Sequence, residues 1–80
     1  MRPFIEYMGN LKWRNDDGEI RGKQIFINDR NGIFIHAQEL AKDKKEVRLQ
    51  LVILHYNKNL YNDSTKYEWY DYKDGKFLKV

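Results

Sequence analysis

Hydrophobic and polar residues alternate along several short stretches of the chain, and segments rich in Asn, Asp and Gly separate these stretches. Alternation with a period of two is typical of strands that bury one face. The clearest example is Glu46 to Tyr56, whose apolar face carries Val47, Leu49, Leu51 and Ile53. Arg48 and Gln50 begin the opposite face. They are two residues apart, which does not fit the 3.6-residue period of a helix, so the pattern favours a strand.

Four further stretches predict strands, namely Phe4 to Arg14, Gly22 to Asn28, Gly32 to Ala37 and Lys66 to Tyr72. The loop between the second and third of these is short and ends at Gly32, so we expect a hairpin there. Asp74 and Gly75 predict a type I′ turn, after which Phe77 to Val80 can return as a short strand.

One stretch has a different character. Gln38 to Lys45 contains good helix formers but is too short to stand alone, which favours one or two helical turns packed through Leu40. The expected order is therefore three strands, a helical turn and two more strands.

This order predicts an all-β fold, a small five-stranded antiparallel barrel similar to the OB fold, with the helical turn between strands 3 and 4. Closure would leave no sheet edge exposed. The alternative is a strongly bent antiparallel sheet wrapped on the short helix. Eighty residues form one domain, 1–80.

Composition narrows the function classes. The absence of cysteine excludes a disulfide framework, a thiolate nucleophile and a cysteine zinc site. No apolar run approaches the roughly 20 residues of a membrane span, and the N-terminus has no signal-peptide pattern, so we expect a cytoplasmic protein. The net charge of +3 permits a nucleic-acid partner without requiring one.

Two segments resemble cold-shock domains. Gly9-Asn10-Leu11-Lys12-Trp13 is similar to the family's opening strand, Gly-x-Val-Lys-Trp-Phe, and Ile33-Phe34-Ile35-His36 is similar to its Val-Phe-Val-His segment. The resemblance covers residues 9–56 and implies an OB-like barrel that binds single-stranded nucleic acid. Gln24 and Arg14 stand where the family has aromatic residues.

A nucleic-acid surface needs flat rings for bases and cations for phosphates. We expect single-stranded RNA ahead of DNA as the ligand. The candidates for binding it are Lys12, Trp13, Arg14, Arg21, Lys23, Phe26, Phe34 and His36. The alternative is that Phe26 and Phe34 pack under a loop or against the C-terminal strand.

Aromatic residues also concentrate near the C-terminus. Tyr and Trp are favoured at protein interfaces, so this region is an alternative binding surface for a host or cognate protein. Its candidate residues are Tyr61, Tyr67, Trp69, Tyr70 and Tyr72. The chain would then be a small protein-binding inhibitor or adaptor, of the kind phages and mobile elements encode. The same rings could instead stack bases or complete the core. We expect a monomer or a weak homodimer.

The sequence offers little for catalysis. His36 and His55 lack the spacing of zinc ligands, and no phosphate-binding loop is present. A ribonuclease in which His36, Lys12 and Glu39 act by general acid–base chemistry stays open as a weaker alternative. We expect a non-catalytic protein with no metal or cofactor.

Overall fold

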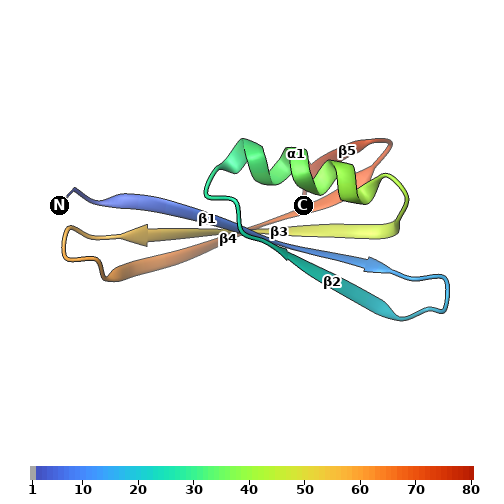
Figure 1. Cartoon of the computed structure of the whole chain (residues 1–80), viewed down its shortest axis with the longest axis horizontal. Helices are drawn as coiled ribbons and strands as arrows, with labels where there is room; N and C mark the ends of the chain where they lie inside the picture. Colours follow the sequence, from blue (N-terminus) through green and yellow to red (C-terminus); the bar gives the residue numbers. More distant parts are fainter. Residues whose placement is uncertain (1) are drawn as a thin grey trace.

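Five strands form one open antiparallel sheet, and one helix packs on one face of it, in the computed structural model that describes residues 2–80 (Figure 1). The elements are β1 (Phe4–Arg14), β2 (Ile20–Ile25), α1 (Arg30–Ala41), β3 (Lys45–Tyr56), β4 (Asn62–Lys73) and β5 (Lys76–Lys79). The strand order across the sheet is β2-β1-β3-β4-β5.

The sheet does not close into the expected barrel, because β2 and β5 lie at opposite edges. The physical reason is the helix. A sheet must bury its apolar face, and α1 covers part of that face, so closure is not required.

Most of the predicted strands are confirmed. β1 has the predicted bounds, β3 begins one residue before the predicted Glu46, and β4 contains the predicted Lys66 to Tyr72. Asp74 and Gly75 have φ angles of 51° and 79°, as the two central positions of a type I′ turn require. The final hairpin therefore forms as expected.

The strand predicted at Gly32 to Ala37 is wrong, because this segment lies in α1. Asp29 caps the helix: its side chain accepts a hydrogen bond of 2.7 Å from the Gly32 backbone N–H. The segment therefore forms no hairpin with β2, which pairs with β1 instead. The helical turn predicted from Gln38 to Lys45 is in fact the last turn of α1, the loop after it and the first residue of β3.

The core lies between α1 and the sheet, mainly over β1 and β3. Its fully buried large side chains are Leu11, Ile33, Leu49 and Leu51. The predicted apolar face of β3 does point to the helix. A Cβ atom on Gly9 would lie 2.8 Å from Cγ2 of Ile33, so the absence of a side chain at Gly9 lets the helix approach the sheet.

The helix is much shorter than the sheet. Twelve helical residues span about 18 Å, whereas the molecule is 47 Å long. Beyond the helix, three strands continue as a distal arm made of Phe4–Glu6, Leu54–Tyr56 and Asn62–Thr65 (Figure 1). In residues 2–80, no helix is both long and apolar enough to cross a membrane.

Candidate functional site

Within residues 2–80, no helix or strand covers the sheet face opposite α1, and we call this face the open face. Leu11, Leu49 and Tyr70 form one cross-strand row on the helix side. Because side chains alternate along strands, the neighbouring rows point to the open face. These rows are Gln24, Asn10, Gln50 and Trp69 in one, and Lys12, Arg48 and Asp71 in the next.

Two aromatic rings lie on this face from β4. Tyr67 is 56% exposed and Trp69 is 40% exposed. They are two residues apart on one strand, which separates them by about 6.6 Å. Two such rings can each offer a flat surface to one of two neighbouring planar groups.

Amide side chains lie beside the rings. Asn10 Nδ2 donates a hydrogen bond of 2.9 Å to Oε1 of Gln50. This bond fixes the two amides relative to each other and leaves Oδ1 of Asn10 and Nε2 of Gln50 as a further acceptor and donor. Gln24 is exposed at the edge of the same row.

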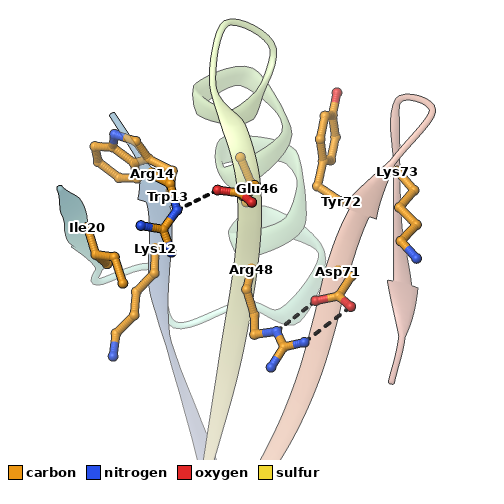
Figure 2. A pocket seen from close by; sticks show the side chains of 10 residues that line it. Lys12, Trp13, Arg14, Ile20, Glu46, Arg48, Asp71, Tyr72 and Lys73 are labelled. Atoms are coloured by element: carbon orange, nitrogen blue, oxygen red, sulfur yellow. Dashed lines mark hydrogen bonds and ion pairs between the residues drawn. The ribbon is translucent and has the colours of Figure 1, made fainter. Parts of the chain in front are cut away.

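Basic side chains gather at the end of the open face that lies farther from the distal arm (Figure 2). Arg48 donates two hydrogen bonds to Asp71, at 2.7 and 3.2 Å. These bonds hold the pKa of the Asp71 carboxyl below its usual value, and the nearby positive charge of Lys73 lowers this pKa further. Asp71 is therefore ionised at neutral pH.

A β-bulge shapes this end of the site. The pairing of β1 with β3 shifts register between Lys12 and Arg14, and Glu46 has a left-handed φ of 52°. Nε of Arg14 lies 2.6 Å from a Glu46 carboxylate oxygen, and Nη1 donates to the Gly18 carbonyl at 2.8 Å. The bulge thus directs Arg14 and Glu46 toward each other.

These side chains border a hollow of about 470 Å³. Four basic residues and two acidic residues line it, which leaves an excess of two positive charges. The basic residues are Lys12, Arg14, Arg48 and Lys73.

The residues predicted to bind nucleic acid lie on both faces of the sheet. Lys12 and Arg14 lie on the open face, whereas Trp13 packs against the core on the other side. Nζ of Lys44 lies 5.1 Å from the centre of the Trp13 ring, and the indole N–H donates to Asn15. Arg21 and Lys23 pair with Trp13 and Leu11 across β1 and β2, so they also lie on the helix side.

The predicted grouping of Phe26, Phe34 and His36 is not present. Phe34 and His36 belong to α1, and the Phe34 ring packs edge-on against Tyr70 with centroids 4.8 Å apart. Phe26 follows β2 and is 74% exposed. The Phe34 ring also packs against Phe77 of β5, with centroids 6.2 Å apart, which is the contact with the C-terminal strand that the sequence left open.

The three residues considered for a ribonuclease are also not close together. His36 and Glu39 are on α1, and Lys12 is on the opposite face of the sheet. Within residues 2–80, no three His, Asp or Glu side chains are arranged to hold a metal ion.

The Tyr-rich segment is also divided between the two faces. Tyr70 and Tyr72 pack against the core on the helix side, whereas Tyr67 and Trp69 lie on the open face. Tyr61 lies between β3 and β4 and is 70% exposed.

Sequence reasoning did not select Asn10, Gln50, Arg48 or Lys73. The alternation along each strand places each of them on a face. Their proximity, however, depends on the cross-strand register, which a single sequence does not specify.

No protein-family model, curated protein or solved structure matches the chain. The chemistry of the open face is therefore the basis for assigning a function.

Proposed function

We propose that the chain binds single-stranded nucleic acid, RNA in preference to DNA, along the open face of its sheet and without catalysis. The observation that carries this proposal is the combination of two exposed rings and several cations on one uncovered surface. Trp69 and Tyr67 would each stack on one base, and Lys12 and Arg48 would contact phosphates.

The amides support RNA as the preferred ligand. Asn10, Gln24 and Gln50 offer both donors and acceptors beside the rings. Such groups can hydrogen-bond to base edges and to the 2′-hydroxyl, which DNA lacks. The resemblance to cold-shock domains stays a prediction: Lys12 of its first segment lies on the open face, whereas Ile33 to His36 is helical.

The proposal is tested by the fluorescence anisotropy of a labelled oligo-pyrimidine RNA at about 50 and about 200 mM salt. With about three phosphate contacts, affinity should fall roughly 20-fold between these salt concentrations. Trp69→Ala should weaken binding about 5- to 100-fold, because one stacked base is worth about 1–3 kcal/mol. A DNA strand of the same sequence should bind more weakly.

Matched controls use residues off the open face. Tyr61→Ala is the control for Tyr67→Ala, since both side chains are largely exposed. Lys66→Gln is the control for Lys12→Gln. Lys66 pairs across the strands with Ile53, whose side chain faces the helix, so Lys66 is not on the open face. Neither lysine forms an ion pair within residues 2–80. If no strand binds at low salt, or the controls weaken binding as much as Trp69→Ala does, the proposal is wrong.

A protein partner is the second candidate, and the distal arm favours it. Beyond the helix, Ile5, Leu60 and Tyr61 are 44%, 55% and 70% exposed. Apolar side chains grouped at one end of a small domain are typical of protein-binding surfaces. Capture of one nuclease-resistant partner from lysate, lost in an Ile5→Ser, Tyr61→Ser variant, would support a protein-binding role over nucleic-acid binding.

A further inference from the structure

The hollow at the basic end of the open face is lined by both charged and apolar residues. Besides its charged residues it is lined by the apolar side chain of Ile20, which is 64% exposed (Figure 2). It could therefore hold a group that is anionic at one side and apolar at the other.

The cations around the hollow keep hydrogen-bonding capacity. Arg14 uses Nε and Nη1 on Glu46 and Gly18, and Arg48 uses Nε and Nη2 on Asp71. Within the described chain, Nη2 of Arg14 and Nη1 of Arg48 have no protein acceptor, and Lys12 and Lys73 form no ion pair. Two guanidinium and two ammonium groups suit the tetrahedral oxygens of phosphate.

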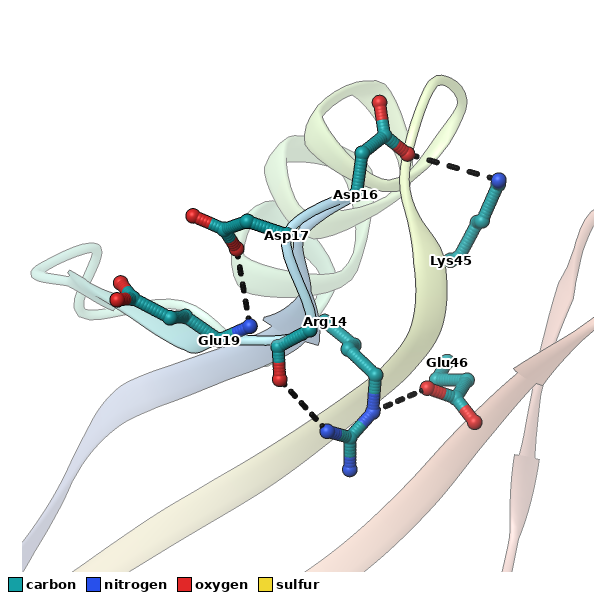
Figure 3. Close-up of polar contacts among 7 residues, drawn as sticks. Arg14, Asp16, Asp17, Glu19, Lys45 and Glu46 are labelled. Carbon is teal, nitrogen blue, oxygen red and sulfur yellow. Dashed lines mark hydrogen bonds and ion pairs between the residues drawn. The ribbon is translucent and has the colours of Figure 1, made fainter.

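The surface beyond the hollow has the opposite charge. The turn between β1 and β2 carries Asp16, Asp17 and Glu19 and no basic residue (Figure 3). Asp16 contacts Lys45 at 3.5 Å and Glu19 contacts Arg21 at 2.9 Å, but all four side chains are more than half exposed, so both ion pairs are weak. A phosphate backbone that continued past the hollow would meet these carboxylates and be repelled.

From these observations we infer that the hollow binds the terminal phosphate of the strand whose bases lie on the open face. The inference rests on the proposed function. A terminal monophosphate carries about 1.5 to 2 negative charges at neutral pH, more than a phosphate within the strand. The excess positive charge of the hollow favours the terminal group, and the exposed side chain of Ile20 can contact the last nucleoside.

Three versions of one internally labelled oligo-pyrimidine RNA test this: one with a 5′-phosphate, one with a 3′-phosphate and one with hydroxyls at both ends. One phosphorylated strand should bind at least about tenfold more tightly than the hydroxyl strand. Which one does so identifies the end that the hollow holds. The Lys12→Gln, Lys73→Gln variant should lose this advantage, and Lys66→Gln should retain it.

The outcomes separate the two proposals. Trp69→Ala should weaken all three strands by a similar factor, because Trp69 stacks a base rather than binding the end. Equal affinity for the three strands would overturn the terminal-phosphate site and leave the proposed function in place. An advantage that survives in the double-lysine variant would also overturn it. Absence of binding by every strand would overturn the proposed function itself. Circular dichroism of each variant checks that it is folded.

Discussion

Three polar side chains, Arg30, Glu68 and Tyr70, join the first turn of α1 to β4. Arg30 donates hydrogen bonds to the Glu68 carboxylate and, at 2.9 Å, to the Tyr70 hydroxyl, which in turn donates to Glu68. The hydrogen bond from Tyr70 lowers the pKa of Glu68 most, and Arg30 lowers it further against the opposing effect of burial. The cluster therefore stabilises the fold while Glu68 is ionised.

We expect Glu68→Gln to lower the free energy of unfolding at about pH 7 by about 1–2 kcal/mol, since the hydrogen bonds lose their charged acceptor. A carboxyl whose pKa is lowered by folding stabilises the protein above its ordinary pKa, here 4.5. That contribution is lost as the pH falls from this value through the lower pKa of the folded state. The difference between parent and variant in urea unfolding should therefore shrink as the pH falls below about 5.

Glu39→Gln is the control for this measurement, because Glu39 forms an exposed ion pair with Lys42 on α1. It should change stability little at any of these pH values. A Glu68→Gln deficit that is the same at acid and neutral pH would show that the charge of Glu68 is not what stabilises the cluster.

At the scale of single elements, α1 is where the sequence pattern was misinterpreted. Ile33 and Ile35 alternate with Phe34 and His36, and β-branched and aromatic residues favour strands. The buried positions Ile33, Ala37 and Ala41, however, repeat every four residues and form a helical stripe. Packing of this stripe on the sheet outweighs the local preference of the isoleucines, a tertiary effect that propensity does not contain.

The N-cap offers a direct check on this element. Asp29→Ala removes the acceptor for the Gly32 N–H and should lower the free energy of unfolding by about 1 kcal/mol. Asp29→Asn keeps an acceptor oxygen and should retain most of the stability. Urea unfolding followed by far-UV circular dichroism measures both variants, and equal losses for Ala and Asn would rule out the cap as the cause.

At the scale of the whole molecule, the strand faces could be predicted and the shape could not. The alternation in Glu46 to Tyr56 correctly separates Leu49 from Arg48, as that in Lys66 to Tyr72 separates Trp69 from Tyr70. Which strands are neighbours depends on contacts between residues far apart in the chain. For this reason Gln50 and Trp69, which share a row of the open face, could not be grouped from the sequence.

The open sheet with its short helix also predicts an uneven distribution of local stability. Around Leu11, Leu49 and Tyr70 the strands are covered by α1, whereas no helix of the described residues, 2–80, covers the distal arm (Figure 1). Segments with few buried apolar contacts open at lower free energy than the core. In hydrogen exchange, the amides of Phe4–Glu6 and Leu54–Tyr56 should therefore exchange much faster than those of Leu11 and Leu49, although all lie in the same hydrogen-bonded sheet.

Uniform protection along β1 and β3 would contradict this, and would mean that something other than the helix, such as self-association through the arm, covers the distal strands. Repeating the exchange at a tenfold lower protein concentration separates these cases, because protection that comes from association falls on dilution.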